Sequence, residues 1–308
     1  MRSLRALRPR VLHVHDPELL TLFPIVKAFV PRLVYDMHEY VPEAVAGKPY
    51  LPQAVRPAAS RTTALAQRSL AALASGVVVV TEGQLDALGS EPELRLVSPN
   101  YPRLERFKDA VPVPELAADP RLKIVYVGSL SRARGCTVML DVMERLGPEE
   151  AVLYLGGTFN DAALEDEVKA RLAAGLEDRV KLLGRVPPAE LPRYLGAAEV
   201  VWVPSVPTAQ YSNTAVATKL FEGMAMGLAA LVSDLPGRGE FIRTERCGLA
   251  VEPGVQGHLE GVRRLLARRA DLPGMGARAR AAVARRYSWE AVERDLVDFY
   301  GALCSGPG

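Results

Sequence analysis

The chain has 308 residues, of which 49% are hydrophobic and 24% charged, which is enough apolar material for two ordinary domains with separate cores. Its formal net charge of +2 is too close to zero for a protein that grips a nucleic acid backbone, so we expect no nucleic acid partner. The 3 cysteines form no C-x-x-C pair, so they indicate incidental thiols in a reducing compartment and no metal site.

The amino-terminal segment is basic and has no apolar core of the kind found in a signal peptide. No apolar run reaches the roughly 18 residues that a membrane-spanning helix needs. We therefore expect a cytoplasmic protein.

The first half of the chain alternates short β-rich runs with segments of helical periodicity, such as the helix predicted over 62–74. A stretch with Pro112, Pro114 and Pro120 interrupts this pattern and predicts a linker. Because few strand signals precede the linker, we expect the first lobe to lack its opening strands. The strands predicted before the linker cover 10–16, 32–38, 76–82 and 94–100.

The second half repeats the alternation more regularly. Continuous apolar strands between helices predict parallel sheets covered on both faces, so the fold class is α/β with two Rossmann-like doubly wound lobes. We expect the lobes over 1–118 and 119–287, followed by a final helix over 288–308. Ligands of such sheets lie beyond the carboxyl ends of the strands. The strands predicted here cover 123–129, 151–157, 179–186, 198–205, 228–234 and 248–253.

The stretch ATKLFEGMAMGLAALVSDLPG, residues 217–237, places two charged residues at the start of an apolar helix. We expect Thr218 to be the N-cap, which puts Lys219 and Glu222 on one face of the helix's amino end. That end attracts anions, and Lys219 adds a full charge, so a phosphate fits there. Glu222 offers acceptors for a ribose diol, as an acidic residue does in dinucleotide folds. The alternative for the two residues is an exposed ion pair.

Other strand ends carry further candidates. Arg134, in the loop after 123–129, can reach a pyrophosphate through bidentate hydrogen bonds. Gly156 lies at the end of the next predicted strand and lets a ligand approach the backbone, and Arg185 and Val186 end the strand after that. Each signal alone is weak, since glycine after a strand is mostly turn chemistry.

Taken together, these stretches resemble the family 4 (group 1) glycosyltransferases, which have the two-lobed GT-B fold and use nucleotide-activated sugars. The resemblance extends from about residue 10 to about 303 and is carried by VLHVHDPELL, LVYDMHEYVPE, VYVGSLSRARG, VKLLGRVPPAELPRYLGAAEVVWVPS, KLFEGMAMGLAALVSDLPG, CGLAVEPG and YSWEAVERDLVDFYGAL. It implies a transferase that moves a hexose-type sugar, with retention of configuration, to an unidentified acceptor in glycan or glycolipid synthesis.

The resemblance also implies roles for single residues. Arg134 and Lys219 would neutralise the leaving nucleotide diphosphate, and His15 falls where the family has an active-site histidine that faces the sugar. Glu222 matches the second carboxylate of the family's E-x7-E motif, which holds the donor ribose. The remaining donor-binding candidates are Gly128, Ser129, Gly156, Arg185, Val186, Thr214 and Leu220.

Two positions depart from the family pattern. Thr214 stands where the first glutamate of the motif is expected, and Ser129 stands where the family usually has an arginine after the strand's glycine. They favour, as an alternative, a non-catalytic nucleotide-sugar-binding protein or an inactive fragment. A sugar-nucleotide epimerase is a further alternative, although it would carry more cleft carboxylates and histidines.

We expect no metal and no cofactor beyond the nucleotide diphosphate sugar. His13 and His38 are interpreted as structural, and for His15 a histidine satisfied at the end of a strand is the alternative. A basic segment is compatible with peripheral contact with an anionic membrane face or a lipid phosphate acceptor, although an ordinary solvated helix face is the preferred interpretation. Its cations are Lys48, Arg56, Arg61 and Arg68.

Overall fold

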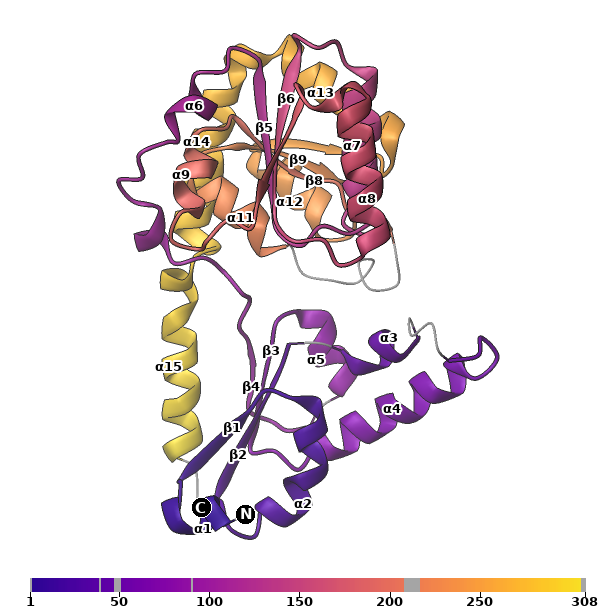
Figure 1. Cartoon of the computed structure of the whole chain (residues 1–308). Helices are drawn as coiled ribbons and strands as arrows, with labels where there is room; N and C mark the ends of the chain where they lie inside the picture. The colour runs from indigo at the N-terminus through magenta and orange to yellow at the C-terminus, as the bar shows by residue number, and fades with distance from the viewer. Residues whose placement is uncertain (1, 39, 47–50, 90, 208–216, 306–308) are drawn as a thin grey trace. The chain divides into compact units, whose positions relative to one another are not determined.

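The computed structural model describes residues 2–38, 40–46, 51–89, 91–207 and 217–305 (Figure 1). Its contacts divide the chain into two compact units. Among the described residues, unit 1 contains those up to 100 and from 292 onward, and unit 2 contains those from 101 to 291.

Unit 1 is built on a parallel sheet of four strands in the order β1-β2-β3-β4. All four predicted strands are confirmed, each shorter than its apolar run. They are β1 (Val11–Val14), β2 (Arg32–Met37), β3 (Gly76–Val79) and β4 (Arg95–Val97). The helical segments of this part are α1 (Arg2–Leu7), η1 (Pro17–Leu22), α2 (Phe23–Val26), α3 (Val41–Ala46), α4 (Arg56–Ala71) and α5 (Glu82–Leu88).

Both faces of the unit 1 sheet are covered, as its apolar strands require. Residues of η1, α2, α4 and α5 pack against one face, around Tyr35 and Val77. The final helix, α15 (Trp289–Ser305), packs Phe299 and Leu303 against Val34 and Val78 on the other face.

Unit 2 contains a parallel sheet of six strands in the order β10-β9-β8-β5-β6-β7. The chain starts at β5, moves outward to β7, and returns to β8 on the other side of β5, so the winding reverses between β5 and β8. Ligands of open α/β sheets bind at the carboxyl ends of the strands at such a reversal. The strands, all predicted, are β5 (Leu122–Val127), β6 (Ala151–Gly156), β7 (Val180–Gly184), β8 (Val200–Val203), β9 (Ala229–Ser233) and β10 (Gly248–Val251).

Alternate residues of these strands feed two different cores, as the two-residue period of a strand dictates. Ile124 and Tyr126 face the core formed with α7, α8 and α13, whereas Val125 faces the core formed with α9, α11 and α14. Figure 1 shows these helices arranged around the sheet. The helical segments of unit 2 are η2 (Leu104–Phe107), α6 (Pro114–Ala117), α7 (Cys136–Arg145), α8 (Ala162–Arg171), η3 (Leu172–Leu176), α9 (Leu191–Gly196), α11 (Thr218–Ala225), α12 (Arg238–Glu245), α13 (Val255–Ala267), η4 (Arg269–Asp271) and α14 (Leu272–Arg286).

The prediction that Thr218 caps α11 is wrong. The helix begins at Thr218 itself, and the N-cap is Ala217, which makes no side-chain capping bond. Lys219 is consequently the second helical residue. The difference is one residue, which is the usual uncertainty of a helix end read from sequence.

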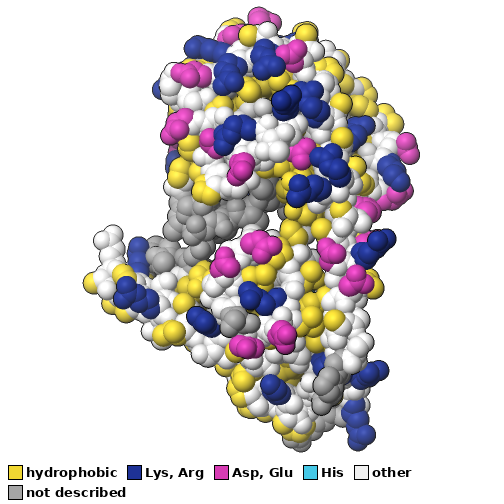
Figure 2. All heavy atoms as spheres, turned by 180° about the vertical axis from the view of Figure 1, so that it is seen from behind, with side chains coloured by type: hydrophobic (Ala, Val, Ile, Leu, Met, Phe, Trp, Pro, Cys, Tyr) yellow, Lys and Arg dark blue, Asp and Glu magenta, His cyan; other side chains and the backbone are white. Residues whose placement is uncertain are grey.

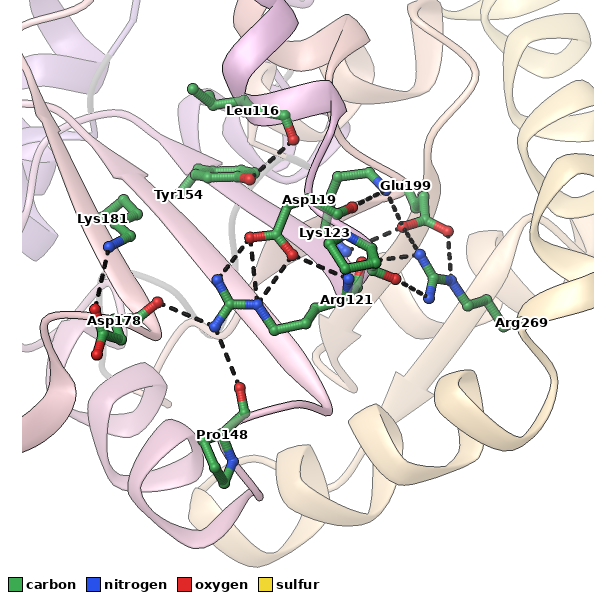
Figure 3. Close-up of polar contacts among 11 residues, drawn as sticks. Leu116, Asp119, Arg121, Lys123, Pro148, Tyr154, Asp178, Lys181, Glu199 and Arg269 are labelled. Atoms are coloured by element: carbon green, nitrogen blue, oxygen red, sulfur yellow. Dashed lines mark hydrogen bonds and ion pairs between the residues drawn. The ribbon is translucent and has the colours of Figure 1, made fainter.

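Charged side chains tie together the amino-terminal ends of the unit 2 strands (Figure 3). The guanidinium of Arg269 donates to both carboxylate oxygens of Glu199, each at 2.8 Å, and that carboxylate also accepts from the backbone N–H of Lys123 at 3.1 Å. Arg121 binds Asp119 and the carbonyl oxygens of Pro148 and Asp178. This network fixes the edge of the sheet opposite to the one where ligands are expected.

Among the described residues, no helix combines the length and the apolar character needed to cross a membrane.

Candidate functional site

The carboxyl end of β5, at the reversal of the sheet, is shaped by glycine. Gly128 has a φ of 152°, and its N–H donates to the carbonyl of Gly156 at 2.9 Å. A Cβ at Gly128 would lie 2.6 Å from Nζ of Lys219. The φ of 152° favours glycine at this position, and a side chain here would also displace the lysine from the strand end.

Lys219 reaches this point from α11. Its Nζ donates to the Tyr126 hydroxyl at 2.5 Å and lies 3.9 Å from the centroid of the tyrosine ring. The Tyr126 hydroxyl in turn donates to the carbonyl of Ser129 at 2.8 Å. The phenol holds the ammonium in place without neutralising its charge. Lys219 therefore does not form the exposed ion pair with Glu222 that the sequence analysis considered as an alternative.

Three cations influence one another at this strand end. Burial, together with the positive charges of Arg134 and Arg238, lowers the pKa of Lys219 to about 7, while Glu222 acts in the opposite direction. A buried ammonium next to two guanidinium groups is costly unless an anion joins it. The electrostatics therefore favour an anionic ligand.

Arg238 was not among the residues predicted from the sequence. It is the first residue of α12, follows Gly237 with its φ of 73°, and is 2% exposed. Its Nη1 donates to the Ser205 hydroxyl at 3.0 Å, just beyond the end of β8. The only sequence signal for it was an arginine shortly after an apolar strand, a signal that also fits an exposed turn.

Glu222 lies on α11, one turn after the lysine, and is half-buried. Burial raises the pKa of its carboxyl group, while the charges of Arg106 and Lys219 oppose the rise. Leu220, between the two, has a fully buried side chain, and its N–H donates to the carbonyl of Ala217 at 2.9 Å. That N–H is engaged within the helix.

The other donor-binding candidates lie around the same edge of the sheet. Val186 occupies the space beside Gly156, where a Cβ would meet its Cγ2 at 2.9 Å. Ser129 donates from its hydroxyl to Oδ1 of Asn160 at 2.5 Å, and Arg185 is exposed after β7. Thr214 lies outside the described residues.

In unit 1, His15 follows β1 and belongs to a cluster that the sequence analysis did not anticipate. Its Nδ1 lies 3.2 Å from Oδ2 of Asp36 and 3.2 Å from Nε2 of His38. Asp36 was missed because an acidic residue inside an apolar strand pattern gave no sign of its neighbours. His13 also contacts this carboxylate, so the two histidines interpreted as structural share one cluster with His15.

The site in unit 2 thus combines an ammonium, two guanidinium groups and a half-buried carboxyl group at the reversal of a parallel sheet. On the face shown in Figure 2, basic and acidic side chains are interspersed over unit 2. A diphosphate with an attached ribose provides both the negative charge and the hydroxyl groups that this set of side chains can bind.

Comparison with known proteins shows which family and fold this chain is similar to. Residues 121–268 match the family described as "Glycosyl transferases group 1". The chain is 30% identical over 189 residues to the amylovoran biosynthesis glycosyltransferase AmsK of Erwinia amylovora, covering 59% of this chain and 45% of that protein. It is 26% identical over 202 residues to the alpha-maltose-1-phosphate synthase of Mycobacterium tuberculosis, covering 62% and 51%. The matched region spans about half the length of these relatives.

Solved structures show the same fold. HepE of Anabaena in complex with UDP superposes with a TM-score of 0.77 at 17% identity, covering 98% of this chain and 80% of that one. The sucrose-phosphate synthase of Thermosynechococcus elongatus superposes with a TM-score of 0.75 at 21% identity, covering 96% and 74%. The expected GT-B architecture is confirmed.

Proposed function

We propose that the chain, whose residues 121–268 match the group 1 glycosyltransferase family and which has a GT-B fold, transfers a hexose-type sugar from a nucleotide diphosphate sugar to an acceptor hydroxyl in glycan or glycolipid synthesis. The observation that carries the proposal is the position of Lys219. It is a half-buried ammonium at the reversal of the sheet, hydrogen-bonded to a phenol and accompanied by Arg134 and Arg238.

In the proposed reaction, the bond between the sugar's anomeric carbon and the diphosphate breaks and a bond to the acceptor oxygen forms. The acceptor hydroxyl gives up its proton to solvent or to the departing phosphate oxygen, and the bonding electrons leave with the nucleotide diphosphate as added negative charge. Lys219, Arg134 and Arg238 stabilise that charge because they are fixed before the reaction begins. These cations stabilise the charge of the leaving diphosphate, as a divalent metal does in other enzymes. The transfer retains the anomeric configuration of the sugar.

Glu222 would bind the donor ribose through its carboxylate oxygens, and the backbone around Val186 would meet the base. UDP is the first probe for the nucleotide, because HepE has been solved with UDP and with UDP-glucose. His15 would orient the sugar or the acceptor.

The test measures donor turnover in the full chain with Lys219→Met, which keeps most of the side chain's length and apolar volume and removes its charge. Loss of one fixed donor to a developing charge typically costs about 10²- to 10³-fold in turnover. We expect a loss of that size, a weaker affinity for UDP and no drop in Tm, since a buried charge is removed. Lys169→Met, on the exposed part of α8, is the matched control.

Three other outcomes are informative. If Lys219→Met turns the donor over at the wild-type rate, the proposed role of the lysine is wrong. If the wild type binds UDP but releases no sugar with any of a panel of acceptors, the chain is a nucleotide-sugar-binding protein. If the recovered nucleotide sugar carries an inverted hydroxyl, the reaction is an epimerisation.

A further inference from the structure

Three histidines surround one carboxylate in unit 1, where β1 and β2 end. Nε2 of His13 and Nδ1 of His15 lie 3.1 and 3.2 Å from the same oxygen, Oδ2 of Asp36. These three ligand atoms all lie within 4.8 Å of one another. His38 completes the group, because its Nε2 lies 3.2 Å from Nδ1 of His15 and 3.4 Å from Oδ1 of Asp36.

These spacings match the edges of a tetrahedral metal site. With zinc–ligand bonds of about 2.0–2.1 Å, two ligand atoms of a tetrahedral site lie about 3.3–3.4 Å apart. Among the three ligand atoms, the two histidine nitrogens lie 3.1 and 3.2 Å from the carboxylate oxygen. Imidazole and carboxylate groups are also the ligands that zinc and its neighbouring transition metals accept, whereas Mg²⁺ prefers an all-oxygen site.

A second contact fixes the orientation of one imidazole. Nδ1 of His13 contacts the hydroxyl of Tyr300, from α15, which leaves Nε2 directed toward Asp36. Metal-binding histidines typically use their other ring nitrogen in this way, and loss of the outer partner weakens metal binding. The carboxylate is 13% exposed, whereas the side chains of His15 and His38 are 58% and 43% exposed, so an ion can enter from their side.

We propose that this cluster binds a divalent transition metal, with Zn²⁺ as the test ion. His13 Nε2, His15 Nδ1 and Asp36 Oδ2 are its three protein ligands. Without the ion, the same side chains form a hydrogen-bonded network. Each of these nitrogens can bind either a proton or the metal ion, so the hydrogen-bonded state and the metal-bound state exclude each other. The ion takes Nδ1 of His15 and leaves its Nε2 free, so the site does not depend on the proposed sugar transfer.

Zinc binding is measured directly on the full chain, without a histidine tag and after removal of bound metal by chelation. Isothermal titration with Zn²⁺ should show one ion per chain. Co²⁺ should give the intense visible absorption of a tetrahedral complex, and Mg²⁺ should show no binding. We expect His15→Gln and Asp36→Asn to weaken Zn²⁺ binding at least tenfold, and Tyr300→Phe to weaken it by about tenfold through His13.

Two control variants separate the cluster from zinc binding at an ordinary surface carboxylate or at a thiol. Asp86→Asn makes the same chemical change on an exposed residue of α5, and Cys304→Ser removes the exposed thiol of α15; both should bind Zn²⁺ as the wild type does. His15→Gln changes an exposed side chain and should fold normally, which circular dichroism confirms, even where Asp36→Asn fails to fold.

The proposal is overturned if the wild type binds no Zn²⁺ at micromolar concentration, or if binding is unchanged in His15→Gln. UDP affinity measured on the same samples keeps the two proposals apart. A chain that binds UDP but not Zn²⁺ contradicts the metal site alone, and a chain that binds Zn²⁺ but not UDP contradicts the proposed function alone.

Discussion

At the scale of single residues, Lys219 provides a titratable ammonium group at the place where an anionic ligand is expected to bind. Burial and the charges of Arg134 and Arg238 lower its pKa to about 7, and the charge of Glu222 on the same helix opposes this shift. The hydroxyl of Tyr126, which the amine contacts, is neutral. Only the protonated amine attracts a diphosphate. Because the protonated fraction falls as the pH rises through about 7, the affinity for UDP should fall over the same range.

Isothermal titration between pH 6 and pH 9 checks this expectation. Lys219→Arg keeps a charge over the whole range, since the guanidinium does not lose its proton. It should flatten the part of the profile above pH 7. A wild-type affinity that stays constant from pH 7 to pH 9 would show that the amine is already charged in the free protein.

Single residues also show where sequence reasoning succeeds. Arg134, Lys219 and Glu222 could be placed at one edge of a sheet, because parallel strands end together and each residue follows a strand or opens a helix. Tyr126 and Arg238 could not be found in the same way. A tyrosine within an apolar strand reads as core, and the contact of Arg238 with Ser205 joins positions 33 residues apart in the chain.

At the scale of elements, the ends of β5 and β6 approach so closely that side chains are excluded. Gly157 has a φ of 142°, and a Cβ there would lie 1.8 Å from the carbonyl oxygen of Gly128. Gly157→Ala must therefore move the backbone at Gly128, next to which Nζ of Lys219 lies. We expect a loss of at least about 2 kcal/mol in the free energy of unfolding, with weaker UDP binding.

Urea unfolding and UDP titration measure the two effects. Gly301→Ala is the control, because this glycine is exposed on α15 and a Cβ added to it would meet no described atom within 4 Å. In the middle of a helix, alanine is more stable than glycine by about 0.5–1 kcal/mol. Equal stabilities of the two variants would contradict the close approach of the strand ends.

The opposite edge of the same sheet provides a second contrast. Arg269 binds Glu199 through two hydrogen bonds and also donates to the carbonyl oxygens of Pro120 and Arg121 (Figure 3). Arg269→Gln leaves the half-buried Glu199 with fewer partners. We expect about 1–3 kcal/mol of lost stability and an unchanged affinity for UDP, since the network lies at the amino ends of the strands.

Thermal unfolding with and without UDP checks this pair of expectations. Arg264→Gln, on an exposed position of α13, should change neither quantity. A weaker affinity for UDP in Arg269→Gln at unchanged stability would mean that the nucleotide binds at the amino edge of the sheet.

The elements themselves were predictable to the extent that periodicity determines them. All ten expected strands are present, because an apolar run between helical segments has few alternatives in a parallel sheet. Their ends were less predictable. The run 76–82 shortens to β3, Gly76–Val79, since Thr81 instead caps α5 through its side chain. The start of α11 was misplaced by one residue for a related reason, because its cap is a backbone geometry at Ala217 without a side-chain bond.

At the scale of the whole molecule, the two units have separate cores and carry separate sites. The residues of the unit 1 cores come from β1 to β4 and the helices on them, including α15, and those of the unit 2 cores come from unit 2 alone. The carboxylate–histidine cluster lies in unit 1, and the cationic strand ends lie in unit 2. A ligand that binds one unit stabilises the elements of that unit against opening.

Hydrogen exchange followed by mass spectrometry distinguishes the two ligands by where they protect the chain. UDP, which lacks the sugar, should slow exchange in β5, β8 and α11, with little change in β1 and β2. Zn²⁺ should do the reverse, protecting β1, β2 and the part of α15 that carries Tyr300. The physical reason is that local opening is governed by the contacts of each core, and these cores share no residue. Protection of both units by either ligand would show that the molecule opens as one cooperative body, and the effects of single variants would then have to be analysed for the chain as a whole.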